Sequence, residues 1–176
     1  MSFAFYSPAP RRADEAHRQS IVDASRVFEH ADDPELQRLV DEAATACNAP
    51  VAAVSIVDND RQWFIVRHGV DARETPRAVS FCAHTQLGDH VFTVPNATAD
   101  ARFSGNPLVT GPLSIRFYAG APLIARDGTG IGALCVIDSQ PRLSLTTDQE
   151  RKLTELADAV MSRITEFSHA SGSSRA

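Results

Sequence analysis

The side chains with the most reactive chemistry gather in the middle of the chain. Cys82 and His84 lie two positions apart, and Cys135 follows later in an apolar run. Thiol chemistry and metal binding both use cysteine beside histidine. Arg102 and Arg116 are each followed by phenylalanine, and a guanidinium in a pocket can bind a carboxylate or phosphate through paired hydrogen bonds. This concentration of thiol, basic and aromatic residues predicts a pocket.

The spacing of the cysteines argues against a metal site. Zinc takes about four ligands, and Cys82 has no CxxC motif or second His/Cys cluster nearby. Cys47 belongs to a helical apolar stripe and Cys135 to an apolar strand, where a free thiol commonly packs as a small hydrophobe. The chain has three cysteines, an odd number at wide spacings that predicts reduced thiols rather than a disulfide framework.

The two arginines and the aromatic residues each have two interpretations. Arg102 and Arg116 either bind an anionic ligand or pair with a nearby acid such as Asp100 and fix the loop, and we favour the second. Phe117 and Tyr118 are neighbours on an expected strand and must therefore face opposite sides of the sheet. The residues predicted to line the pocket are Phe81, Cys82, His84, Arg102, Phe103, Tyr118 and Cys135. We assign no catalytic residue and no metal ligand.

Two amphipathic helices are predicted near the ends of the domain. Residues 33–47 begin with Asp-Pro, a good N-cap followed by proline at the first helical position, and continue with apolar residues at helical spacing. Thr147 and Glu150 form a capping box, and a second apolar stripe runs from Leu153 to Ile164. Ser80 is positioned to cap a short helix between them.

The remaining patterns predict an α+β fold. The expected strands cover residues 51–57, 62–67, 91–94, 117–125 and 131–137. Hairpin-linked strands between terminal helices favour a mainly antiparallel sheet of five or six strands. We expect the terminal helices on one face of that sheet. A layer of loops and short helices, including the irregular residues 96–115, should cover a pocket on the other face.

Size and charge limit the domain organisation and the partners. The 176 residues fit one domain, which we divide into an arm with a possible helix at 1–30, a folded domain at 31–168 and a disordered Ser/Gly-rich tail at 169–176. A net charge of −5 argues against nucleic-acid binding. No apolar stretch approaches the roughly 20 residues of a membrane span, and no signal peptide begins the chain. We expect a cytoplasmic protein.

Several linked motifs resemble those of bacterial GAF domains, from about residue 33 to residue 167. These motifs are Val54-Ser55-Ile56-Val57-Asp58, Arg61-Gln62-Trp63-Phe64, Ser80-Phe81-Cys82-Ala83-His84, Asn106-Pro107-Leu108-Val109, Arg116-Phe117-Tyr118-Ala119-Gly120-Ala121-Pro122-Leu123 and Leu134-Cys135-Val136-Ile137-Asp138. The resemblance implies a sensory or regulatory module in signal transduction. Such a module would bind a small molecule, signal to a partner protein through its terminal helices and perform no catalysis of its own.

The resemblance leaves two other functions open. Free methionine-(R)-sulfoxide reductases are also GAF proteins, but their reactive cysteines lie close together in sequence, whereas Cys47, Cys82 and Cys135 are far apart. A pure dimerisation scaffold with a filled pocket is the third interpretation. The signatures of cyclic-nucleotide-binding and bilin-attaching members are missing, so the cofactor stays unknown. We expect a homodimer formed through Asp33–Cys47 and Thr147–Phe167, because a two-fold pair would bury both apolar stripes.

Overall fold

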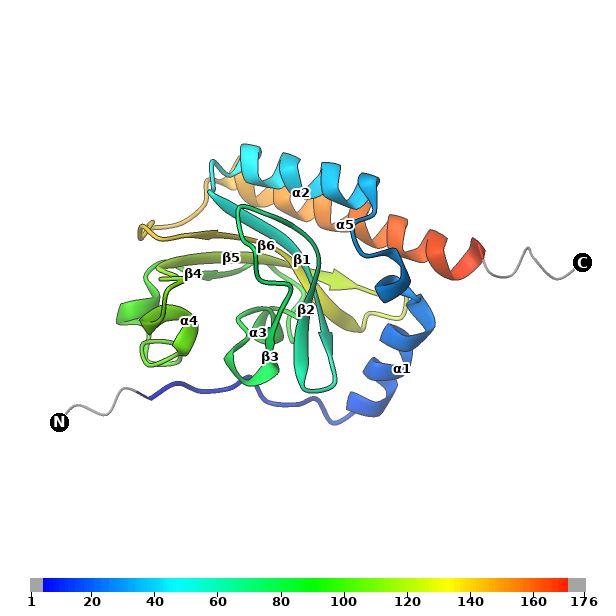
Figure 1. Cartoon of the computed structure of the whole chain (residues 1–176), viewed down its shortest axis with the longest axis horizontal. Helices are drawn as coiled ribbons and strands as arrows, with labels where there is room; N and C mark the ends of the chain where they lie inside the picture. The colour runs from blue at the N-terminus through cyan, green and yellow to red at the C-terminus, as the bar shows by residue number, and fades with distance from the viewer. Residues whose placement is uncertain (1–4, 171–176) are drawn as a thin grey trace, which may run out of the picture.

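A six-stranded antiparallel sheet divides the molecule into two layers (Figure 1). The computed structural model describes residues 5–170. In spatial order the strands are β3 (Glu74–Pro76), β2 (Arg61–His68), β1 (Val51–Asp58), β6 (Gly130–Asp138), β5 (Phe117–Ile124) and β4 (Phe92–Val94). The β1–β2 and β5–β6 hairpins meet through the antiparallel pairing of β1 with β6. The predicted α+β fold and its antiparallel sheet are therefore confirmed.

One face of the sheet is covered by two helices that lie side by side, α2 (Pro34–Ala46) and α5 (Thr147–Ala170) (Figure 1). Asp33 caps α2 by accepting a hydrogen bond of 3.0 Å from the amide of Leu36. The same carboxylate accepts two hydrogen bonds from Arg163 of α5, at 2.7 and 3.1 Å. A residue predicted only as a helix cap therefore also joins the two terminal helices.

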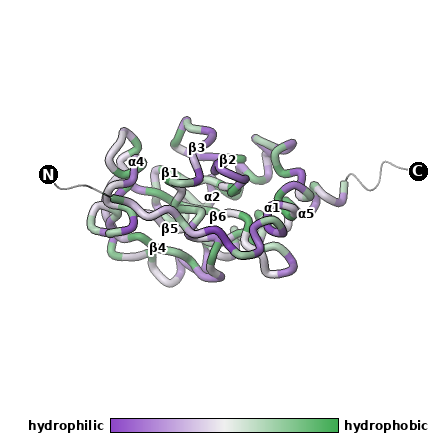
Figure 2. The backbone as a smooth tube through the Cα atoms, turned by 90° about the horizontal axis from the view of Figure 1, so that it is seen from below, coloured by the Kyte–Doolittle hydropathy of each residue, from purple (hydrophilic) through white to green (hydrophobic). Residues whose placement is uncertain are grey.

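Both terminal helices turn their apolar stripes inward. The buried residues are Leu36, Leu39, Val40, Ala43 and Ala44 of α2, and Leu153, Leu156, Ala157, Val160, Ile164 and Phe167 of α5. Of the large hydrophobic side chains that the structure describes, only Phe5 and Leu143 are exposed. The stripes on which the homodimer was predicted are thus buried within one chain. Strongly hydrophilic stretches lie around β3 and the neighbouring end of β2 (Figure 2).

Short segments make up the layer on the other face. They are the helices α3 (Cys82–Thr85) and α4 (Pro107–Thr110) and the 3-10 turns η2 (Arg77–Val79) and η3 (Ala97–Ala99). The N-terminal segment runs along the outside of this layer (Figure 1). The amide of Ser7 donates to the carbonyl of Arg102 at 2.9 Å, and the amide of Gly105 donates to that of Phe5 at 3.1 Å. In its described part, the arm is hydrogen-bonded to the domain.

The chain ends differ in detail from the division made on sequence. The possible helix in the arm is α1 (Glu15–Ser25), which is followed by the 3-10 turn η1 (Val27–His30). At the other end α5 continues to Ala170, so the first two residues of the predicted disordered tail are helical. The remainder of that tail, residues 171–176, and the first four residues of the arm lie outside the described residues.

A buried ionic cluster fixes α1 to the sheet. Glu15 binds both Arg18, at 2.9 Å, and Arg77. Arg18 is fully buried and also donates to the carbonyl of Val57 at 2.7 Å, and Arg77 donates to that of Asn59 at 2.9 Å. Burial raises the pKa of Glu15, but the hydrogen bonds from the two guanidinium groups outweigh it and lower this pKa to about 2. Sequence patterns gave no sign of this cluster.

We predict that Glu15→Gln destabilises the protein by about 2–3 kcal/mol at pH 7, because it leaves two largely buried arginines without their carboxylate. Glu15 has a lowered pKa in the folded state, so its contribution is present above its unfolded pKa of 4.5 and is lost as the pH falls toward about 2. Urea unfolding between pH 7 and pH 3 measures the effect. The wild type should lose stability in this acidic range more steeply than the variant.

Glu29→Gln is the matched control, since Glu29 forms one exposed ion pair with Arg26. Exposed pairs contribute about 0–1 kcal/mol, and this variant should unfold nearly as the wild type does. Equal stabilities for the two variants would show that the buried cluster does not hold α1.

Candidate functional site

The strands β5 and β6 present one face to the helices and the other to the loop layer. Phe117 packs into the core beneath α2 and α5, whereas its neighbour Tyr118 packs into a second core beneath the loop layer. This is the opposite orientation that the strand period predicted. Both side chains are fully buried. Two separate apolar cores therefore share one set of strands.

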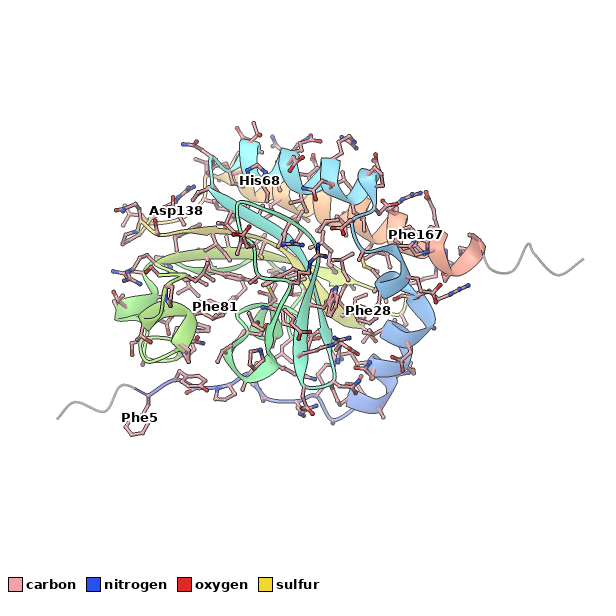
Figure 3. All side chains as sticks on the ribbon, viewed as in Figure 1. Phe5, Phe28, His68, Phe81, Asp138 and Phe167 are labelled. Carbon is pink, nitrogen blue, oxygen red and sulfur yellow. The ribbon has the colours of Figure 1, made fainter. Side chains whose placement is uncertain are left out.

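The second core contains a small cavity of about 20 Å³. Its lining residues are Gln62, Phe64, Phe81, Cys82, Leu108, Leu113, Ile115, Tyr118, Cys135 and Ile137. Phe81 lies beneath the sheet beside the loop layer (Figure 3). A cavity of this volume holds about one water molecule. The pocket predicted from sequence is thus almost filled by its own side chains.

Four of the predicted site residues meet at this cavity: Phe81, Cys82, Tyr118 and Cys135. Their partners there come mainly from β2 and from the loop at residues 105–116. Sequence reasoning missed these partners, of which Leu108, Leu113 and Ile115 belong to the loop. The available signal was the long irregular segment itself, since a loop of that length in a compact domain is commonly functional.

A chain of hydrogen bonds crosses the cavity wall. The hydroxyl of Thr85 and the hydroxyl of Tyr118 are 2.7 Å apart, and the Tyr118 hydroxyl donates to the sulfur of Cys82 at 3.2 Å. Gly120 makes room for this arrangement, because a Cβ at that position would lie 2.3 Å from the Tyr118 oxygen. Ser80, predicted to cap a short helix, accepts a hydrogen bond of 3.0 Å from the amide of Ala83, whereas the N-cap position of α3 is Phe81.

Cys82 and Cys135 are the chemically distinctive pair of the site. Both are free, buried thiols that line the same cavity. Burial raises the pKa of Cys82, but the nearby Cys135 thiol and the hydrogen bond from Tyr118 outweigh it, and the net direction is downward. The proximity of Cys82, together with burial, raises the pKa of Cys135. Of the two sulfurs, Cys82 is therefore the one that accepts a hydrogen bond from Tyr118.

Two polar side chains on the same side of the sheet lack hydrogen-bond partners. Both polar atoms of the Gln86 amide are buried and unpaired, and so is the hydroxyl of Ser55. The Ser55 hydroxyl lies near enough to Cys82 to help lower its pKa, but not in an acceptable hydrogen-bond geometry. Unpaired buried groups are uncommon in native proteins and are often bound to water or a ligand.

The other predicted site residues form a cluster outside the cavity. His84 stacks on Phe92 with ring centroids 6.0 Å apart. Its Nε2 lies 3.1 Å from the carbonyl oxygen of Ser7, and the His84 side chain forms no hydrogen bond with the thiols. Arg102 binds Asp100 at 2.6 Å and lies over the rings of Phe92 and Phe103. This geometry agrees with the second interpretation given to Arg102, in which the arginine pairs with Asp100 and fixes the loop.

Phe103 connects the outer cluster to the cavity. Its ring stacks on that of Phe81 at a centroid distance of 4.1 Å, yet it does not line the cavity. Arg116, the other arginine considered as an anion ligand, donates to the carbonyls of Val109 and Ile115 at 2.9 and 3.0 Å. Arg116 therefore holds the loop that roofs the cavity.

Residues 5–170 contain no group of three or more His, Cys, Asp or Glu side chains arranged to hold a metal ion. Among their helices, none is both long enough and apolar enough to cross a membrane.

The fold is an antiparallel sheet between a layer of two helices and a layer of loops and short helices, and comparison with known proteins identifies the family. The family model of the GAF domain matches residues 33–164. This chain belongs to the GAF domain family. The match covers α2, most of α5, the whole sheet and the cavity.

Individual relatives agree with this assignment. A cyclic di-GMP phosphodiesterase of Pseudomonas aeruginosa is 44% identical over 155 residues, which are 88% of this chain and 26% of that protein. The GAF domain of an Acinetobacter phosphoenolpyruvate-protein phosphotransferase is 19% identical with a TM-score of 0.61, covering 86% of this chain and 96% of that one. A type II free methionine-R-sulfoxide reductase from Thermoplasma acidophilum is 14% identical with a TM-score of 0.64, covering 80% and 96%. The two structures establish the shared fold alone.

We predict that Gly120→Ala destabilises the protein by about 1–3 kcal/mol, the usual cost of overpacking a core. The new methyl group would displace the Tyr118 hydroxyl and break its bonds to Thr85 and Cys82. Gly88→Ala is the control, because its nearest neighbour is a carbonyl oxygen 4.0 Å away. Thermal unfolding of both variants measures the difference, and equal melting temperatures would contradict the packing described here.

Proposed function

We propose that this chain is a sensory and regulatory GAF module that binds a small molecule in the cavity beneath α3 and transmits the event through α2 and α5. The observation that carries the proposal is the shared use of β5 and β6. Their loop-side residues line the cavity, and their opposite residues pack against α5. In this proposal the module acts in the cytoplasm and has no catalytic activity of its own.

The coupling between the two faces is mechanical. Tyr118 faces the cavity and Phe117, the next residue on β5, faces the helices. A ligand that displaces Tyr118 shifts the backbone of β5, and close-packed interiors transmit such displacements rather than absorb them. Phe117 then moves against the helical layer. A change in helix packing is a bistable element that a partner protein can read.

Ligand entry requires the loop at residues 105–116 to open, because the cavity is nearly filled. Asn106 anchors the loop with a hydrogen bond of 3.0 Å to the carbonyl of Val79, and Arg116 closes it from the other end. Leu108 and Leu113, which form the roof of the cavity, are only half-buried. Loops with few buried contacts open at low free-energy cost, so this loop is the entrance in our proposal.

The relative from P. aeruginosa supports a signalling role. This chain spans about a quarter of that phosphodiesterase, so its enzymatic activity is not transferred to the chain. In our proposal, the segment of the phosphodiesterase that matches this chain regulates the rest of that protein. The partner of this module is, in the same way, a signalling protein. The small molecule itself is unidentified.

One observation favours the scaffold function instead. The cavity of about 20 Å³ leaves room for little more than a water molecule, as expected of a scaffold whose pocket is filled by its own side chains. The homodimer through Asp33–Cys47 and Thr147–Phe167 stays a prediction in both cases. Because their apolar stripes are buried within one chain, such a dimer would use the polar outer faces of these helices.

Native mass spectrometry of the chain purified from its own source tests the binding function. We expect a species heavier than the 19.0 kDa chain by the mass of a bound compound, and a dimer would appear in the same spectrum. Leu113→Trp should fill the roof of the cavity and abolish the added mass. Leu143→Trp is the matched control at an exposed position. Wild-type protein with no added mass and no ligand-dependent stabilisation would favour the scaffold.

A separate assay tests the absence of catalysis. The protein is incubated with free methionine sulfoxide and a dithiol reductant, and methionine formation is followed. We expect no turnover, because catalytic thiols need access to substrate and both thiols of the cavity are fully buried. Turnover that disappears in Cys82→Ser would overthrow the proposal and assign the enzymatic function instead.

A further inference from the structure

We propose that Cys82 and Cys135 form a redox switch that hydrogen peroxide converts into an intramolecular disulfide. The cavity would then respond to an oxidant as well as to a bound small molecule. Disulfide formation itself is independent of the proposed function, whereas its effect on the terminal helices rests on it.

The geometry brings the two thiols together from different elements. Cys135 lies in the middle of β6, where it is paired with Ala53 on β1 and Gly120 on β5. Cys82 is the first residue of α3, a helix of four residues. Both side chains line the same small cavity, and α3 packs against β6. A disulfide requires a closer approach of the sulfurs, to about 2.05 Å, and the single-turn helix α3 is the element able to supply that movement.

The Tyr118 hydroxyl gives each sulfur a different part in the reaction. It donates a hydrogen bond of 3.2 Å to the sulfur of Cys82, and such a donor stabilises a thiolate. Cys82 is therefore the attacking sulfur. Cys135 lines the same cavity, which is the position of a resolving cysteine.

The reaction balances with one peroxide and two thiols. The Cys82 sulfur attacks one oxygen of hydrogen peroxide, the O–O bond breaks, and the leaving hydroxide takes the Cys82 proton to form water. This step produces a sulfenic acid at Cys82. The Cys135 sulfur then attacks the Cys82 sulfur, the S–O bond breaks, and hydroxide leaves with the Cys135 proton as a second water. Both sulfurs are oxidised, and the peroxide is reduced to water.

The cavity selects its oxidant by size. Its volume of about 20 Å³ is that of about one water molecule, and hydrogen peroxide is only slightly larger. A bulky hydroperoxide can reach Cys82 only when the loop at residues 105–116 opens.

Cys47 is an internal control, since it is also fully buried but lies in the other core, where burial raises its pKa.

The test exposes the full native chain to hydrogen peroxide, then denatures it and alkylates the remaining thiols with N-ethylmaleimide. The reduced protein should take up three equivalents, matching its three free cysteines, and the oxidised protein one. Peptide mapping should join Cys82 to Cys135, and dithiothreitol should restore full alkylation. With tert-butyl hydroperoxide the reaction should be at least about tenfold slower, because it depends on local opening.

Variants make the outcome specific. Cys47→Ser should form the same disulfide as the wild type, whereas Cys82→Ser and Cys135→Ser should form none. The inference is overturned if the wild type stays fully reduced, if Cys47 reacts as fast as Cys82, or if Cys82 is oxidised without joining Cys135. The peptide map of the wild type decides these points even where a variant does not fold.

Hydrogen exchange of residues 147–167 separates the switch from the proposed function. A disulfide that forms and changes this exchange supports both. A disulfide that forms without any change supports the switch but contradicts transmission through α5. A ligand bound in native mass spectra, with no disulfide after peroxide, contradicts the switch and leaves the sensory function standing.

Discussion

Strands β1, β5 and β6 are buried along almost their whole length on both faces, and the pairing of β1 with β6 joins the two hairpins. Side chains alternate along each of these three strands, so each of them contributes to both cores. The helical layer, the loop layer and the cavity all depend on this register. A slip of one residue would exchange the two sets of side chains and destroy both cores.

Charged residues attach the peripheral segments to this central sheet. Asp33 joins the start of α2 to Arg163 of α5, and Glu15 joins α1 to the β1–β2 turn through Arg18 and Arg77. In both cases a largely buried charged group is paired with an opposite charge, so that neither is left isolated in the core. The helical layer is therefore held by directional contacts as well as by its apolar stripes. Such contacts exist in discrete arrangements, which suits a regulatory element.

The small cavity links the two proposals. Its polar atoms are few and internally bonded, apart from Ser55 and Gln86 nearby. A ligand and a disulfide would both act on Cys82, Tyr118 and the short helix α3. Either event would move β5 or β6, and each strand contacts α5 on its opposite face. Chemical and binding signals would thus reach the same output through the same strands.

The sequence by itself determined the α+β fold, the two terminal helices with the Asp33 cap of α2, the hairpins, and the opposite orientation of Phe117 and Tyr118. These features follow from local periodicity and from linked family motifs. The capping box of α5 was predicted one residue too late, because Thr146 and Gln149 form it and not Thr147 and Glu150. Only the tertiary structure decided that the cavity is almost filled, that His84 and Arg102 lie outside it, and that Glu15 holds α1. The physical reason is that such contacts join residues distant in sequence. Their meeting depends on strand register and loop packing, which no local pattern encodes.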